Sequence, residues 1–161
     1  KWFQNKNIQM YSPFFNLHKN GILHMSTTKI PEKVIKDDLE IAKDYSKKIA
    51  EKLNYIGTMC VEFFLDEDGP KLNEIAPRVH NSGHLTIEAY NISQFENHVR
   101  AVMNLENSIT TLKHDAVMTN ILGSDIIDAR KSKYLNKQFF HDYLKTDIKE
   151  HRKMGHLTEL L

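Results

Sequence analysis

Two glutamates, Glu62 and Glu74, are the first candidates for chemistry in this sequence. They lie in apolar runs at 59–65 and 71–76, and the residues between these runs are turn formers. This pattern predicts an antiparallel hairpin. If it folds symmetrically about Asp68, the residues that face each other are Glu62 and Glu74, Phe64 and Leu72, and Leu65 and Lys71.

Carboxylates that face each other across a hairpin repel, and their apolar neighbours leave little water to screen them. A hard divalent cation such as Mg²⁺ would relieve that repulsion, because it binds carboxylate oxygens together with substrate phosphates. For this spacing alone, an ordinary surface glutamate paired with a lysine is the alternative.

A polar cluster follows the second glutamate. Pro77 ends the strand because proline donates no hydrogen bond to a sheet. The residues after it include Arg78, His80, Asn81, Ser82, Gly83 and His84. A polar cluster at the end of a buried strand is where a rigid scaffold displays functional side chains. The composition equally allows a solvated loop that only caps a helix starting near Thr86.

The segment 73–84, NEIAPRVHNSGH, is long enough to carry a resemblance. Together with Glu62 and the segments 86–89 and 93–96, it closely resembles the ATP-grasp enzyme 5-(carboxyamino)imidazole ribonucleotide synthase, the ATPase subunit of phosphoribosylaminoimidazole carboxylase. The resemblance implies a carbon–nitrogen ligase of purine biosynthesis. In that reaction ATP phosphorylates bicarbonate to carboxyphosphate, and the carbon dioxide unit passes to the exocyclic amine of aminoimidazole ribonucleotide.

The same resemblance implies roles for individual residues. Glu62 and Glu74 would hold Mg²⁺ or Mn²⁺, and the residues placed at ATP are His18, Asn73 and Glu74. Arg78 and His80 would be catalytic, with Arg78 suited to bind bicarbonate or carboxyphosphate through bidentate hydrogen bonds. Asn81 and Ser82 would hold the substrate together with His80.

A basic stretch near the end of the sequence, 145–155, has two interpretations. Such a charge run is most often a solvated face, but arginine and lysine also bind phosphate. The segments 118–123 and 152–156 resemble the family's small C-terminal domain, where a lysine and an arginine bind the ribonucleotide phosphate. The matching positions are Lys145 and Arg152, with Lys153 a further substrate-binding candidate. The sequence departs from the family at Leu144 and 149–151, so Lys149 or Lys153 could replace Lys145.

The elements that must position these residues predict an α+β fold. Strands are expected at 8–17, 22–27, 116–122, 139–144 and 156–160, besides the central hairpin, and helices at 37–54, from Ser93 onward and at 126–136. Ser93 and Glu96 form a capping box. The residues expected on the buried faces of the first two helices are Leu39, Ala42, Tyr45, Ile49 and Leu53, and Phe95, Val99, Val102 and Met103.

The predicted domains are 1–105, the C-terminal part of an ATP-grasp unit with an antiparallel sheet and flanking helices, and 106–161, a small mostly-β domain. The loop 104–112 marks the boundary. We expect the isolated chain to be inactive, because it matches only the C-terminal half of the enzyme and lacks the N-terminal half that holds adenine and phosphates. A homodimer is the family's expected state.

Composition excludes several classes of protein. The sequence carries 22 basic and 21 acidic residues, which gives no reason to expect a nucleic acid or a membrane as partner. No apolar run approaches the ~20 residues that span a bilayer, and the first residues lack the apolar core of a signal peptide. One cysteine, Cys60, excludes an internal disulfide and fits a reducing, cytoplasmic location. Its apolar surroundings favour a structural thiol over a nucleophile.

Two alternatives stand beside this interpretation. Another ATP-grasp ligase or carboxylase would share Glu62 and Glu74 but not the segment 152–156. A non-catalytic binding module with the same fold would show no Mg²⁺-dependent ligand binding.

Overall fold

The computed structural model describes residues 8–106 and 109–161. Its larger sheet is antiparallel, with five strands in the order β1-β2-β5-β7-β6. The bounds are β1 Phe15–Lys19, β2 Ile22–Thr27, β5 Ala116–Leu122, β6 Gln138–Asp142 and β7 Lys153–Leu160. Because β2 pairs with β5, strands from both sides of residue 105 share this sheet. The predicted domain boundary at residue 105 therefore separates two strands, β2 and β5, that are neighbours in one sheet. The boundary stays a prediction.

The β1–β2 hairpin closes at the Asn20-Gly21 turn, which lies between the predicted strands 8–17 and 22–27. Both residues have positive φ, 51° and 74°, as a two-residue hairpin turn requires. The predicted strand start at residue 8 is wrong, since β1 begins at Phe15. Pro13 explains the difference because it cannot contribute a hydrogen-bond donor to the sheet.

A second, two-stranded sheet consists of β3 (Cys60–Asp66) and β4 (Gly69–Ala76). Glu62 faces Glu74 as predicted, but the other two predicted pairs are wrong, because Phe64 faces Lys71 and Leu65 faces Pro70. The chain turns tightly between Asp66 and Gly69, one residue short of the symmetric fold. A register shift after Glu62 compensates for this by leaving Asn73 as an extra, unopposed residue in β4.

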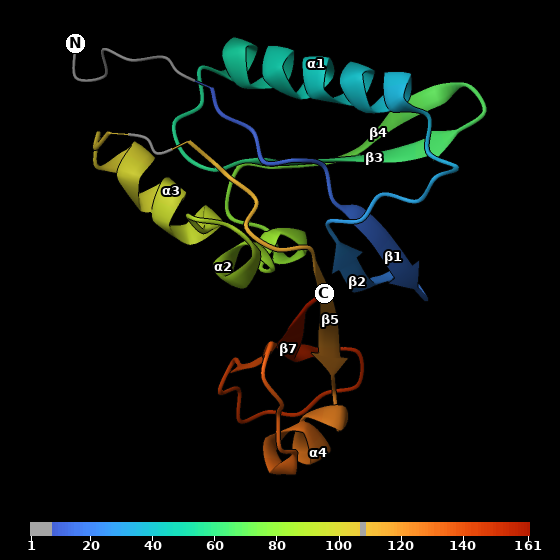
Figure 1. Cartoon of the computed structure of the whole chain (residues 1–161), viewed down its shortest axis with the longest axis vertical. Helices are drawn as coiled ribbons and strands as arrows, with labels where there is room; N and C mark the ends of the chain where they lie inside the picture. The colour runs from blue at the N-terminus through green and yellow to red at the C-terminus, as the bar shows by residue number, and fades with distance from the viewer. Residues whose placement is uncertain (1–7, 107–108) are drawn as a thin grey trace.

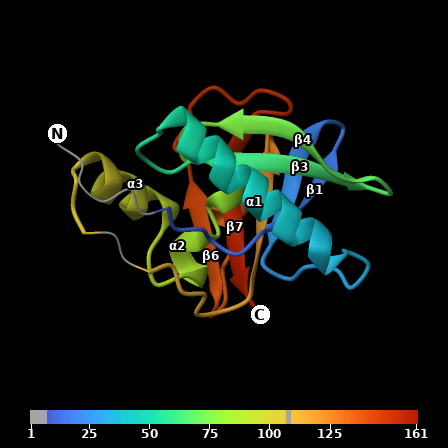
Figure 2. The same ribbon diagram turned by 90° about the horizontal axis from the view of Figure 1, so that it is seen from above.

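Helix α1 (Lys36–Leu53) lies along this hairpin, as Figures 1 and 2 show. Acidic Asp37 and Asp38 occupy its first turn and Lys52 its last, which suits the helix dipole. The Tyr45 and Phe63 rings lie 6.5 Å apart. The predicted buried face is only partly covered, since Tyr45 and Leu53 are exposed. No helix in the described part of the chain is long and apolar enough to cross a membrane.

Helix α3 (Gln94–Val102) begins as the sequence predicts, because the Ser93 hydroxyl accepts a hydrogen bond from the Glu96 backbone N–H at 3.2 Å. Its predicted buried face is wrong. Phe95, Val99, Val102 and Met103 are 39–65% exposed, whereas Gln94 is 3% exposed. The helix is anchored by its polar first residue. Its apolar stripe is largely exposed, although the Phe95 ring lies 5.3 Å from the His84 ring.

The main core lies where the five-stranded sheet meets α2 (Thr86–Ala89). The buried residues of this cluster are Leu85, Ala89, Tyr90, Ala116 and Met118, with Tyr11, Phe14 and Leu160 packed against them. Helix α4 (Asp125–Lys131) ends earlier than the predicted 126–136. Strand β7 begins at Lys153 rather than 156, which places a predicted substrate residue on a strand instead of a loop.

Candidate functional site

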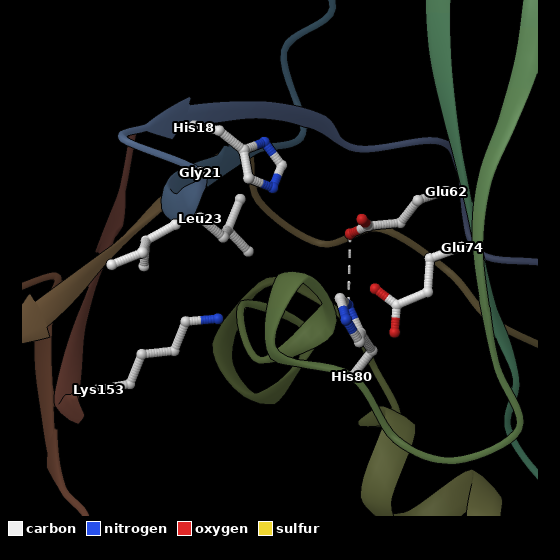
Figure 3. Close-up of a pocket in the computed structure, with 8 residues that line it drawn as sticks. His18, Gly21, Leu23, Glu62, Glu74, His80 and Lys153 are labelled. Atoms are coloured by element: carbon white, nitrogen blue, oxygen red, sulfur yellow. Dashed lines mark ion pairs between the residues drawn. The ribbon is translucent and has the colours of Figure 1, made fainter. Parts of the chain in front are cut away.

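One pocket of about 300 Å³ collects residues from four separate parts of the chain (Figure 3). Its lining residues are His18, Gly21, Ile22, Leu23, Glu62, Glu74, His80 and Lys153. They come from the β1–β2 hairpin, the β3–β4 hairpin, the loop after β4 and the start of β7. Five predicted site residues, His18, Glu62, Glu74, His80 and Lys153, therefore line one pocket.

The two glutamates differ in their surroundings. Glu62 has a side chain 10% exposed, and Glu74 one that is 48% exposed. The unopposed Asn73 donates from Nδ2 to Glu62 Oε2 over a long 3.5 Å. The register shift after Glu62 thus brings Asn73 beside the carboxylates. Its contact with the nucleotide stays a prediction.

Asn16 is a site residue that the sequence analysis missed. From β1, its Nδ2 donates to Glu62 Oε1 at 3.3 Å. Its orientation is set by Ser26, whose hydroxyl donates to Asn16 Oδ1 at 2.6 Å. Asparagine is uncommon in strands, and its place within an apolar strand is the signal that could have identified it.

This set of ligands fits Mg²⁺. Two opposed carboxylates and an adjacent side-chain amide offer hard oxygen donors at the edge of a pocket, and Mg²⁺ is bound through one or two carboxylates plus substrate phosphates. Glu62 and Glu74 are the residues that would hold it.

His80 lies beside the glutamates with its ring fixed by two contacts. Nδ1 is 3.5 Å from Glu62 Oε1 and 2.9 Å from Ser82 Oγ. Burial lowers the pKa of His80 below its usual value, although Glu62 and Glu74 oppose that shift. A neutral imidazole that touches a carboxylate and a hydroxyl can donate or accept a hydrogen bond toward a bound substrate.

Gln94 holds the loop that carries His80. Its Oε1 accepts from the His80 backbone N–H at 2.9 Å, and its Nε2 donates to the His80 carbonyl at 2.7 Å. The second Nε2 proton is directed to His84 Nδ1, 2.9 Å away. Gly83 permits this approach, because a Cβ there would lie 2.7 Å from Gln94 Oε1. The sequence analysis did not assign a role to Gln94.

Asn81 is tied to the five-stranded sheet. Its Nδ2 donates to Asn120 Oδ1 at 2.9 Å, and Asn120 Nδ2 donates back to Asn81 Oδ1 at 2.7 Å. Asn120 also donates to the Leu23 carbonyl. Ser82 is buried beside His80, with its Oγ 3.8 Å from Cys60 Sγ. The two predicted substrate residues are therefore held from opposite sides, Asn81 by β5 and Ser82 by β3.

The predicted phosphate-binding residues separate into two groups. Lys153 lines the pocket on the side opposite the glutamates (Figure 3), and burial lowers the pKa of its ammonium group. Lys145 donates to the Lys153 carbonyl at 2.7 Å and lies over the Tyr143 ring. Arg152 instead donates to the Asp147 carbonyl at 2.9 Å, and Lys149 pairs with the Asp147 carboxylate. Neither Arg152 nor Lys149 is among the residues that line the pocket.

Arg78 lies at the margin of the site. Its guanidinium is 3.9 Å from Glu74 Oε1, donates to the Val79 carbonyl and is 60% exposed. The structure thus places a predicted anion-binding residue directly beside a predicted metal ligand.

Cys60 lies on the same strand as Glu62, two residues before it. The thiol is free, and burial raises its pKa to about 11. Its side chain contacts Ser82 as described above. The protonated thiol agrees with the predicted structural role.

Three histidine rings pack against one another, and one of them, His84, belongs to the loop that carries His80. The rings of His141 and His156 are nearly parallel with centroids 4.5 Å apart, and His84 lies 5.1 Å from His156. His141 Nε2 is 2.6 Å from Glu88 Oε1. Burial lowers the pKa of His84 to about 4 and that of His156 to about 3. This cluster was also missed, because residues far apart in sequence form it.

Comparison with known proteins identifies the class first. Residues 3–95 match the ATP-grasp domain, and the chain belongs to the ATP-grasp family. Residues 116–160 match the phosphoribosylaminoimidazole carboxylase C-terminal domain, so the resemblance and the α+β architecture expected from the sequence are confirmed.

The similar proteins are carboxyaminoimidazole ribonucleotide synthases. The chain is 41% identical over 156 residues to the N5-carboxyaminoimidazole ribonucleotide synthase of Bacillus subtilis, covering 96% of this chain and 40% of that protein. The Staphylococcus aureus N5-carboxyaminoimidazole synthetase complexed with ADP has a TM-score of 0.86 at 37% identity, with 99% and 43% of the two chains covered.

A third similar structure is the Aspergillus clavatus N5-carboxyaminoimidazole synthase in complex with ADP and 5-aminoimidazole ribonucleotide. It has a TM-score of 0.83 at 29% identity, with 92% of this chain and 41% of that one covered. The chain thus spans about two fifths of the length of the relatives it matches.

Proposed function

We propose that the protein containing this chain carboxylates 5-aminoimidazole ribonucleotide to 5-(carboxyamino)imidazole ribonucleotide, using ATP and bicarbonate. The observation that carries this proposal is the opposed pair Glu62 and Glu74 at one pocket with His80 and Lys153. The matches to both the ATP-grasp domain and the carboxylase C-terminal domain support it.

In this proposal the β3–β4 hairpin carries the residues that bind the metal ion and the nucleotide. Glu62 and Glu74 hold Mg²⁺, which supplies positive charge against the ATP phosphates. Asn16 and Asn73 hold the Glu62 carboxylate by hydrogen bonds, so that its charge is directed into the site. His18 lies across the pocket from the hairpin and contacts the nucleotide.

The chemistry takes two steps. A bicarbonate oxygen attacks the γ-phosphorus of ATP, ADP leaves, and carboxyphosphate forms. The amine nitrogen of the ribonucleotide then bonds to the carboxyl carbon, inorganic phosphate leaves, and the amine loses a proton. Arg78 binds the anion beside Glu74 by a bidentate hydrogen bond. Neutral His80 orients the reacting groups and, with Asn81 and Ser82, limits water around the unstable intermediate.

The ribonucleotide phosphate is assigned to the basic residues near β7. Lys153 lines the pocket and Lys145 contacts its backbone, so these two lysines are the nearer candidates. Arg152 serves as well if its contact with Asp147 is exchanged for the phosphate.

The relatives are longer than the matched region, and in this proposal their remaining length supplies the rest of the ATP site. The 161-residue chain alone is then inactive. Assembly as a homodimer and a cytoplasmic location stay predictions.

The experiment is an ATPase assay on the full-length gene product that contains this chain, with Mg²⁺ and bicarbonate. We expect ADP release to depend on aminoimidazole ribonucleotide. Turnover with a different acceptor only would mean another ATP-grasp ligase. The complete absence of ATP hydrolysis would support a non-catalytic binding module.

A further inference from the structure

We propose that Cys60, Glu62 and His80 form a binding site for Zn²⁺ that overlaps the Mg²⁺ site and blocks it. The thiol, one carboxylate oxygen and a ring nitrogen of these residues all lie within 4.8 Å of one another. The side chains of Glu62 and His80 are only 10% and 12% exposed. The Zn²⁺ site is independent of the proposed reaction, but its inhibitory effect rests on that proposed function.

The fold brings the three side chains together. Cys60 and Glu62 are two residues apart on β3, so both point to the same face of the hairpin. Cys60 faces the small residue Ala76 across the hairpin. His80 is brought to the same place by the loop that Gln94 anchors.

The distances suit zinc with small movements of the side chains. Tetrahedral zinc ligands at their usual bond lengths lie about 3.3–3.7 Å from one another. His80 Nδ1 and Glu62 Oε1 are already 3.5 Å apart. Two of the three ligands, Glu62 and His80, line the pocket, which leaves a fourth position for water. The Ser82 hydroxyl, 2.9 Å from His80 Nδ1 and 3.8 Å from Cys60 Sγ, lies between two of the ligands.

The donor types decide which metal binds. Thiolate and imidazole are ligands of Zn²⁺, whereas Mg²⁺ takes oxygen ligands only. Binding replaces the thiol proton by the metal, so one S–H bond is exchanged for one S–Zn bond and a proton is released. Because Glu62 belongs to both sites, Zn²⁺ and Mg²⁺ cannot both use its carboxylate in full, and occupancy by Zn²⁺ weakens Mg²⁺ binding.

The direct test is a titration of this chain with Cd²⁺, a spectroscopic substitute for Zn²⁺, monitored by the ultraviolet absorption of the thiolate–metal bond. We expect one equivalent to bind with that absorption, and Zn²⁺ to displace it. Cys60→Ser should abolish the band. His80→Gln, which keeps the thiol, should weaken binding at least about tenfold, the lower end of what losing even an outer-shell partner costs.

The matched control is His114→Gln, which changes an exposed histidine and should leave both the band and the affinity unchanged. No band in the wild-type chain, or unaltered Cd²⁺ affinity in both Cys60→Ser and His80→Gln, would overturn the site. Since no substrate is present, this result is independent of whether the carboxylation proposal holds.

A second test addresses the inhibition. In the full-length gene product, we expect Zn²⁺ to inhibit ATP hydrolysis, excess Mg²⁺ to relieve the inhibition, and Cys60→Ser to require at least tenfold more Zn²⁺. Equal sensitivity of Cys60→Ser and wild type would disprove inhibition through this site.

Discussion

The Gln94 side chain forms hydrogen bonds with both backbone groups of His80. It accepts from the N–H at 2.9 Å and donates to the carbonyl at 2.7 Å. Only a side-chain amide can donate and accept in this way. Gln94 is 3% exposed, so no water can replace either bond. The position of the His80 ring at Glu62 therefore depends on the first residue of α3.

Replacing Gln94 by glutamate tests this dependence. The shape is kept, but a carboxylate cannot donate to the His80 carbonyl, which leaves two buried acceptors facing each other. We expect the free energy of unfolding to fall by about 1–3 kcal/mol, measured by urea titration of this chain. Glu96→Gln is the matched control on the same helix, because its exposed pair with Arg100 should contribute less than about 1 kcal/mol. An equal loss in both variants would contradict the role assigned to Gln94.

The opposed glutamates predict opposite effects on stability and activity. Without metal, Glu74→Gln removes a like-charge repulsion across the hairpin, so we expect the free energy of unfolding to rise by about 0.2–1 kcal/mol. In the full-length gene product the same change should abolish Mg²⁺-dependent ATP hydrolysis. Glu67→Gln, an exposed carboxylate at the hairpin turn, should leave activity unchanged. If Glu74→Gln is destabilising without metal, the repulsion argument is wrong.

The buried histidines predict a loss of stability in mild acid. In the unfolded chain His84 and His156 take up protons near pH 6.5, whereas burial lowers their folded pKa to about 4 and about 3. The unfolded state binds more protons between these limits, so stability falls as the pH drops below about 6.5. Each histidine contributes a slope of up to about 1.4 kcal/mol per pH unit.

Urea titrations between pH 7 and pH 5 measure this slope. His156→Gln should reduce it, and His114→Gln, at an exposed position, should not. A slope that stays the same in His156→Gln would show that the pKa of His156 is the same in the folded and the unfolded chain, which contradicts the lowering by burial.

The share of the active site present in this chain gives a further prediction. The relatives are about two and a half times as long as the matched region, which covers 40% of the Bacillus subtilis protein. We expect the 161-residue chain alone to show no bicarbonate-dependent ATP hydrolysis, and the full-length gene product to show it under the same conditions. Comparable rates per mole would contradict the expectation that the remaining length contributes to the site.

Local signals in the sequence predicted the elements that carry the site, but not all of its contacts. Turn formers and a proline defined the β3–β4 hairpin, and the Glu62–Glu74 pairing was correct. The pairs predicted between Glu62 and the turn were wrong. The tight turn shifts the pairing by one residue, and the extra residue Asn73 shifts it back before Glu74. Neither feature leaves a clear signal in composition.

Tertiary contacts explain the other differences. The apolar stripe of Phe95 and Val99 predicted the buried face of α3, but the helix is held by Gln94. Asn16 reaches Glu62 across two sheets, and spacing along the chain gives no indication of such a contact. The resemblance to the family could be found in the sequence chiefly because the residues that carry it, 73–84, are adjacent in the chain.

The central claim is that Glu62 and Glu74 support carboxyl transfer to the ribonucleotide. The most direct measurement follows radiolabelled bicarbonate into aminoimidazole ribonucleotide, with the full-length gene product, ATP and Mg²⁺. We expect acid-labile label in the ribonucleotide, dependent on ATP and absent with Glu74→Gln. Equal label transfer by Glu74→Gln and the wild-type protein would contradict the proposed role of the two glutamates. The absence of transfer by the wild-type protein would contradict the proposed reaction.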